Sequence, residues 1–411
     1  MLRSLVLASL MVVPATAVAG PEAPVIGGSN APQGMWPATA AILYGSASDP
    51  AAANGDPVNS FECSGVLVAP TVVLTAGHCV PGVEGSGTDY IGDLTGALIG
   101  AASLDDASAG DLITLQNTDI QEYPSSQTSI DIGIIKLPTA SKMTPAPIAD
   151  GWAKFDIVNG AKVEFVGFGS IDKNGAQYIP EEQEAQSTIT DFDCSKSPGC
   201  NSAAMPDGEL GAGGSGIDTC PGDSGGGMYL VTSYGTFVAG ITSRGYSTDT
   251  FDCSQGGIYG RPDKIVDYIE MVTGATLAHG PMPTAPAIAA VTGGLGTTTI
   301  TTNDPSASDH HFAITTPPAG GKAAVSEQGD VRFCAGTATG SDAVTISVTD
   351  ANNSTRTVPV TIPIDVTTGA GSGACDVDGF PSGGCCDVGG NPSGSAVLVL
   401  VVGLLLVRRR S

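Results

Sequence analysis

The segment that most constrains this 411-residue chain reads D-T-C-P-G-D-S-G-G over residues 218–226. It places the hydroxyl of Ser224 on a tight turn with glycines on both sides. In such a turn the backbone N–H groups of Gly222 and Ser224 can point at one spot, as a developing oxyanion requires. Because a serine hydroxyl is a poor nucleophile until a base takes its proton, the segment predicts a histidine close to it in the fold.

His78 is the candidate base among the four histidines of the sequence. It lies in T-A-G-H-C, directly after an apolar run from Val66 to Leu74 that predicts a buried strand. Asp131 is the candidate to orient the ring, because it is a lone carboxylate entering the apolar run S-I-D-I-G-I-I-K-L, where an unpaired charge is costly. The order His, Asp, Ser is one of the known orders of a catalytic triad.

Together these segments resemble the chymotrypsin/trypsin family of serine proteases, from about Val25 to Gly274. The resemblance implies an all-β domain over residues 25–275, built of two β-barrels and a C-terminal helix. It implies a serine endopeptidase that acts on protein or peptide substrates. In its mechanism Ser224 attacks the scissile carbonyl, His78 transfers the proton and Asp131 holds the imidazole. The N–H groups of Gly222 and Ser224 would form the oxyanion hole.

The same resemblance implies activation by a new N-terminus at Val25, in V-I-G-G. Its ammonium would pair with Asp223, since such a buried charge is tolerable only when it is paired. Pro24 stands where the family commonly has Arg or Lys. We therefore predict that residues 20–24 are a short propeptide, trimmed by an unknown activating peptidase that is not trypsin-like.

Substrate preference is expected to depend on Asp218, six positions before Ser224, where trypsin-like members place the acid at the base of the pocket. Gly245 and Gly257 would leave the walls of this pocket open, so the resemblance implies cleavage after Arg or Lys. Ser243 begins a tripeptide, ending at Gly245, that would pair with the substrate backbone.

Arg244, the middle residue of that tripeptide, stands where the family usually has Trp or Phe. Two interpretations are open. Arg244 could favour acidic or polar side chains upstream of the cut, or it could form an internal ion pair with a nearby aspartate.

Ten cysteines indicate an oxidising compartment. The resemblance implies disulfides Cys63–Cys79 and Cys220–Cys253, and the short spacing of Cys194 and Cys200 suggests a third. The pairing of four further cysteines stays open: Cys334, Cys375, Cys385 and Cys386. We predict no cofactor and no metal. His310 and His311 are expected in a surface turn because no cysteine or carboxylate stands at convincing ligand spacing.

Both ends of the chain carry export signals. Arg3, an apolar run from Leu5 to Val13 and the sequence A-V-A predict a signal peptide over residues 1–19, and hence a secreted or cell-surface bacterial protein. The last residues, 395–411, join an apolar run to three arginines and resemble a MYXO-CTERM sorting tail. They would be the only membrane contact. The tail is either a signal for a sorting peptidase or a simple transmembrane-helix anchor.

Between these ends we predict a Pro/Ala-rich linker at 276–287, a β-sandwich at 288–366 and a disordered Gly/Ser-rich linker at 367–394. The sandwich resembles Ig-like or cadherin-like modules of bacterial surface proteins. A formal charge of −25 argues against nucleic acid as a partner, since phosphates would be repelled. The competing class is a non-catalytic adhesin on a protease fold. Such proteins usually lose a triad residue, and here all three candidates are present.

Overall fold

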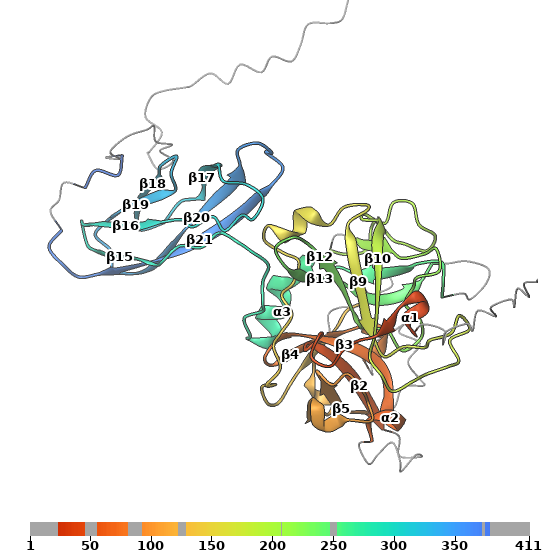
Figure 1. Cartoon of the computed structure of the whole chain (residues 1–411). Helices are drawn as coiled ribbons and strands as arrows, with labels where there is room; N and C mark the ends of the chain where they lie inside the picture. Colours follow the sequence, from red (N-terminus) through yellow and green to blue (C-terminus); the bar gives the residue numbers. More distant parts are fainter. Residues whose placement is uncertain are drawn as a thin grey trace, which may run out of the picture. The chain divides into compact units, whose positions relative to one another are not determined.

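The computed structural model describes residues 24–45, 56–80, 93–121, 129–206, 208–246, 253–371 and 375–378. They form two compact units divided between Pro281 and Met282 (Figure 1). The predicted signal peptide, the sorting tail and all of the propeptide except Pro24 lie outside the described residues. Within the part of the chain that is described, no helix has the length and apolar character needed to cross a membrane.

One sheet of the first unit is an open half-barrel with the strand order β6-β5-β2-β3-β4-β8-β7. Its strands are β2 (Thr39–Gly45), β3 (Phe61–Ala69), β4 (Val72–Thr75), β5 (Asp93–Ile99), β6 (Asp111–Thr114), β7 (Ile120–Gln121) and β8 (Gly133–Lys136). The strand predicted from Val66 to Leu74 is in fact two antiparallel strands, β3 and β4. Pro70, which has no N–H to donate, starts the turn between them.

The other sheet of this unit closes on itself. Its strands are β1 (Ser29–Asn30), β9 (Lys162–Gly167), β10 (Gln183–Asp191), β11 (Glu209–Ala212), β12 (Gly227–Val231), β13 (Thr236–Gly245) and β14 (Gly257–Gly260). Because β9 pairs with both β10 and β12, every strand except β1 belongs to a closed barrel. The predicted all-β double-barrel fold is therefore confirmed, with one barrel closed and the other a half-barrel.

The predicted C-terminal helix of this unit is present, directly after a short turn. Residues Pro262–Lys264 form a 3-10 turn, and α3 spans Val266–Thr273. In the 3-10 turn the Asp263 carboxylate pairs with the Arg261 guanidinium at 2.8 Å. Gly274 ends the helix in the left-handed conformation, with φ of 69°, which glycine adopts most readily.

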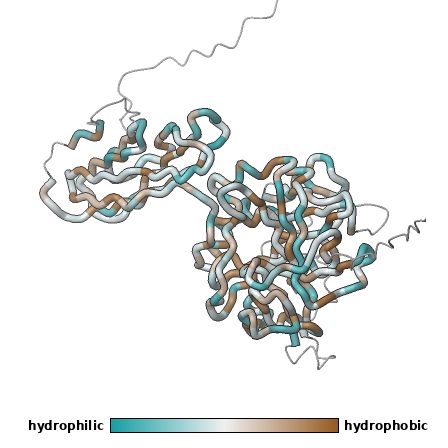
Figure 2. Tube along the Cα trace, viewed as in Figure 1, coloured by the Kyte–Doolittle hydropathy of each residue, from teal (hydrophilic) through white to brown (hydrophobic). Residues whose placement is uncertain are grey.

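The second unit contains two sheets. A four-stranded sheet has the order β15 (Ile288–Val291), β21 (Thr357–Thr367), β20 (Gly340–Asp350) and β17 (His310–Thr316). A three-stranded sheet has the order β16 (Leu295–Thr299), β19 (Asp330–Ala335) and β18 (Gly321–Val325). Figure 2 shows apolar and polar residues interspersed along these strands, and on β21 every second residue from Val358 to Val366 is buried.

The predicted surface turn at His310 and His311 is wrong. Both residues lie at the start of β17, and the His310 side chain is buried. Its Nε2 is 3.3 Å from a carboxylate oxygen of Asp304, which also contacts the Arg356 guanidinium. A carboxylate partner only six residues earlier in the sequence makes burial of this histidine tolerable.

Candidate active site

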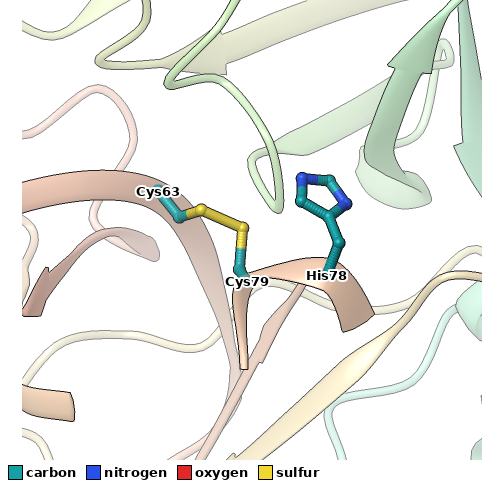
Figure 3. Close-up of side chains that lie close together, drawn as sticks. All are labelled: Cys63, His78 and Cys79. Atoms are coloured by element: carbon teal, nitrogen blue, oxygen red, sulfur yellow. A yellow bond between two sulfur atoms is a disulfide. The ribbon is translucent and has the colours of Figure 1, made fainter. Parts of the chain in front are cut away.

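The histidine and the aspartate meet because their strands are neighbours. His78 lies in the 3-10 turn Gly77–Cys79 directly after β4, and Asp131 lies just before β8. Strands β4 and β8 pair antiparallel with Thr75 opposite Gly133, which brings both residues to one end of the sheet. His78 Nδ1 is 2.8 Å from Asp131 Oδ2, and the backbone N–H of His78 donates to Oδ1 at 2.8 Å. Figure 3 shows the ring extending from the same turn as the Cys63–Cys79 disulfide.

The residue before His78 must be a glycine because the Asp131 carboxylate lies so close to this turn. A Cβ atom at Gly77 would lie 2.7 Å from Asp131 Oδ1, closer than real Cβ contacts allow. The motif T-A-G-H-C therefore has a packing reason for its glycine, in addition to its place in the turn.

The Asp131 carboxylate is held ionised by its hydrogen bonds. Burial acts to raise its pKa, but donation from His78 and from the Ser243 hydroxyl outweighs burial, so the pKa of Asp131 lies below the usual value. A carboxylate only accepts, so Nδ1 of His78 carries the proton of the neutral ring. His78 Nε2 is thereby left as the acceptor, which is the state that a general base needs.

Ser224 is brought to the same end by tight packing of its loop. A Cβ atom at Gly225, where φ is 85°, would overlap the hydroxyl of Thr75 at the end of β4. No hydrogen bond joins the Ser224 hydroxyl to His78 within the described chain. Such bonds are often long in unliganded enzymes and shorten when substrate binds.

Two N–H groups in the Ser224 loop are without acceptors. Among the described residues, neither Gly222 nor Ser224 donates its backbone N–H, whereas Asp223 between them donates to Cys220 O at 2.9 Å. Gly222 has φ of 94°, which only glycine tolerates easily. A pair of free donors on one turn is what a developing oxyanion needs.

Ser64 on β3 holds this loop, and the sequence analysis missed it. Its N–H donates to Ser224 O at 2.9 Å, and its hydroxyl donates to Gly222 O at 2.8 Å. Ser64 is fully buried. The signal in the sequence was a lone hydroxyl within the apolar run C-S-G-V-L-V-A.

Val25 and Asp223 are both buried, without an ion pair between them in the described chain. The Val25 side chain packs in the core with Phe165 and Leu210, while Pro24 still precedes it. Asp223 accepts from Gly169 N at 2.8 Å and from Cys220 N at 2.9 Å. Burial raises the pKa of Asp223 to about 7 despite these bonds.

Asp218 is a second buried acid. It accepts from Thr219 N at 2.9 Å and from Gly256 N at 2.8 Å, and burial raises its pKa to about 7. No cation pairs with it within the described chain. A Cβ atom at Gly245 would meet nothing within 4 Å, whereas one at Gly257 would lie 3.3 Å from Arg244 O.

Arg244 forms an internal ion pair, but with a glutamate and not with an aspartate. Its Nη1 and Nη2 donate to the two carboxylate oxygens of Glu209, each at 2.7 Å. The second of the two open interpretations therefore describes the structure, apart from the identity of the acid. Glu209 lies on β11, 35 residues before Arg244 in the sequence.

The structure contains disulfides at the three expected pairs, Cys63–Cys79, Cys194–Cys200 and Cys220–Cys253, and a fourth at Cys334–Cys375. Cys385 and Cys386 lie outside the described residues. The two described clusters of metal-ligand residue types are Cys63 with His78 and Cys79, and Cys194 with Cys200 and Glu209. Their cysteines are all in disulfides, so these sulfurs are not available as ligands.

A closed barrel beside a half-barrel, with serine, histidine and aspartate gathered between strand ends, defines a protein of the serine endopeptidase class. Residues 25–269 match the model of the Trypsin family, and the chain belongs to this family. The match includes more than half of the 411 residues.

Individual relatives are distant. Brachyurin of Leptuca pugilator is 28% identical over 262 residues, which are 61% of this chain and 100% of the relative. The proclotting enzyme of Tachypleus tridentatus is 27% identical, over 60% of this chain and 65% of its own length. Among solved structures, the Vibrio cholerae protease VesB is 19% identical with a TM-score of 0.45, over 84% of this chain and 100% of that one.

Proposed function

We propose that this serine endopeptidase uses Ser224, His78 and Asp131 as its triad and is secreted. His78 Nε2 takes the proton as Ser224 Oγ bonds to the scissile carbonyl carbon. The same proton then passes to the leaving amine, and water repeats the sequence to release the acyl group. The 2.8 Å bond from His78 Nδ1 to Asp131, and the free N–H groups of Gly222 and Ser224, support these roles.

We further propose cleavage after Arg or Lys, and one observation carries this: the Asp218 carboxylate is buried with no cation beside it in the described chain. A buried carboxylate favours a cationic substrate side chain, and it penalises an apolar one by remaining unpaired. The open space beside Gly245 supports a route for that side chain.

The pH dependence of specificity tests this proposal. Because the pKa of Asp218 is raised to about 7, the carboxyl is mostly neutral at pH 5 and ionised at pH 8. We expect the ratio of kcat/KM for an Arg substrate to that for its Gln analogue to rise with pH up to about 7 and then level off. Taking the ratio cancels the pH dependence of the catalytic steps that both substrates share.

In Asp218→Ser this ratio should be low and independent of pH, a loss of about a thousandfold in preference. Asp218→Asn is the matched control, because it keeps the shape and removes the charge. Equal cleavage after Leu, Phe and Arg by the wild type would show that Asp218 does not select the substrate.

The proposed layout is a signal peptide, a short propeptide, the protease domain, an Ig-like module and a surface-sorting tail. Export is supported by the disulfides, which persist in oxidising compartments. The Ig-like assignment is supported by the seven strands of the second unit, which form one four-stranded and one three-stranded sheet, as a β-sandwich requires.

For the tail we propose recognition and removal by a sorting peptidase. Residues 396–407 would span about 18 Å as a helix, well short of a hydrocarbon core of about 30 Å. The intact mass of the surface-associated protein should therefore correspond to a chain without residues 395–411. A mass that retains them would make the tail an anchor and not a sorting signal.

A further inference from the structure

The hydroxyl of Ser243 connects Asp131 to a charge that the triad does not include. Ser243 Oγ is 2.7 Å from Asp131 Oδ2, the same oxygen that accepts from His78 Nδ1. It is also 3.1 Å from Nη1 of Arg244, the next residue along β13. Ser243 is buried, so water does not compete freely for these bonds.

The chemistry of the two neighbours fixes where the Ser243 proton points. A guanidinium has five N–H donors and no acceptor, so Ser243 Oγ can only accept from Arg244. The single hydroxyl proton of Ser243 is then free to donate only to Asp131. A serine hydroxyl without such a neighbour could rotate its proton to other acceptors.

Three further hydrogen bonds, to two residues, hold the Arg244 guanidinium in place. Both oxygens of Glu209 accept from it at 2.7 Å, and Gly199 O accepts from Nη2 at 3.0 Å. The Glu209 side chain is only 2% exposed, and it also accepts from Asn201 N at 3.2 Å. Gly199 lies in the loop closed by the Cys194–Cys200 disulfide. A two-pronged pair of this kind has a defined geometry that a single contact lacks.

We infer that Arg244, clamped by Glu209, is a positioning residue that directs the Ser243 hydroxyl onto Asp131 and thereby steadies the His78–Asp131 pair. The inference rests on the proposed triad. The charged groups that face Asp131 in this arrangement are His78 and, through Ser243, Arg244 with Glu209. Arg244 does not contact the reacting atoms, so its effect must pass through Ser243.

The rate of labelling by a small alkyl fluorophosphonate, measured against pH, tests the inference. In this reaction Ser224 Oγ bonds to phosphorus, fluoride leaves and His78 takes the hydroxyl proton, with no use of the Asp218 pocket. We expect Arg244→Met to slow labelling about tenfold. The midpoint of the acid limb should rise by about half a pH unit, because the variant removes a positive charge and a steadied hydrogen bond from the surroundings of the Asp131 carboxylate.

A double-mutant cycle with Ser243→Ala separates this route from a remote effect of charge. In the Ser243→Ala background, Arg244→Met should change neither rate nor midpoint. The inference would be overturned if Arg244→Met had the same effect with Ser243 and with alanine at this position. It would also be overturned if Arg244→Met had no effect in the otherwise wild-type enzyme. Arg244→Met leaves the buried Glu209 carboxylate without its cation, which could disturb the fold. The double variant Glu209→Gln/Arg244→Met avoids this, and it should show the same coupling to Ser243.

Lys162→Met is the matched control, since it removes an exposed cation at the start of β9 and should leave rate and midpoint unchanged. A wild-type enzyme that is not labelled at all would count against the proposed triad. If the wild type is labelled, and Arg244→Met is labelled at the same rate and with the same midpoint, the positioning role is contradicted while the proposed triad is not.

Discussion

Ser224→Ala, His78→Ala and Asp131→Asn should each lower kcat/KM by about a thousandfold or more, with the fold retained. Alanine at 224 removes the nucleophile, and alanine at 78 removes the base. Asparagine at 131 changes the hydrogen bonding more subtly. The Asp131 carboxylate accepts from His78 N, His78 Nδ1 and Ser243 Oγ, whereas an amide has only one oxygen and would turn an NH₂ group toward donors.

The losses should not multiply when the substitutions are combined. If the three residues act as one unit, a double variant should be about as slow as the worse single variant. Single-turnover rates measure this, with fluorophosphonate labelling to count active sites. Ser141→Ala is the matched control, because it also removes a buried serine hydroxyl, and it should leave turnover unchanged. Multiplying losses would contradict the triad, and absence of labelling in the wild type would favour a non-catalytic binding protein.

The motifs could be read from the sequence because each is set by local chemistry. Gly222, Ser224 and Gly225 share one turn whose shape follows from its own residues, and the turn before His78 needs Gly77 for a close approach. The apolar run from Val66 to Leu74 likewise predicted buried β-structure, whereas the double-barrel fold was implied only by the resemblance to the serine protease family. These features depend on neighbours in sequence, so no knowledge of the tertiary structure was needed.

The features that escaped prediction depend on contacts between distant segments. Glu209 and Arg244 are 35 residues apart, and nothing in either segment indicates that the other is its partner. Ser64 contacts the Ser224 loop across about 160 residues, with 158 separating it from Gly222. His310 was expected at the surface although its partner Asp304 is only six residues away, because Asp304 is itself buried and contacts Arg356, 52 residues further along the chain.

The form that begins at Val25 should be the active one, and its advantage should grow with pH. In the chain that retains Pro24, Asp223 is buried without a cation, and burial raises its pKa to about 7. A carboxyl whose folded pKa exceeds its unfolded value stabilises the fold below the unfolded pKa, near 3.9, and loses that contribution as pH rises toward 7. The ammonium of a free Val25 would reverse this by favouring the ionised carboxylate.

Backbone conformation favours the same cut. Val25 has φ of 34°, in the left-handed region that costs a β-branched residue of order 1–3 kcal/mol. Hydrolysis before Val25 removes the preceding carbonyl and with it this constraint. A cut before Val25 would therefore relieve a strained residue and supply a cation to the buried Asp223 in one step.

Thermal unfolding of the two forms, measured from pH 5 to pH 8, tests this account. The Tm of the Val25 form should exceed that of the form beginning at Gly20 by an amount that increases across this range. Asp223→Asn should remove that increase, and it should leave the Val25 form with little activity because the oxyanion loop has lost its charged anchor. N-terminal sequencing of active enzyme identifies which form works. Full activity with Gly20 still present would mean that Asp223 orders the Ser224 loop without any ammonium, through its bonds to Gly169 and Cys220 alone.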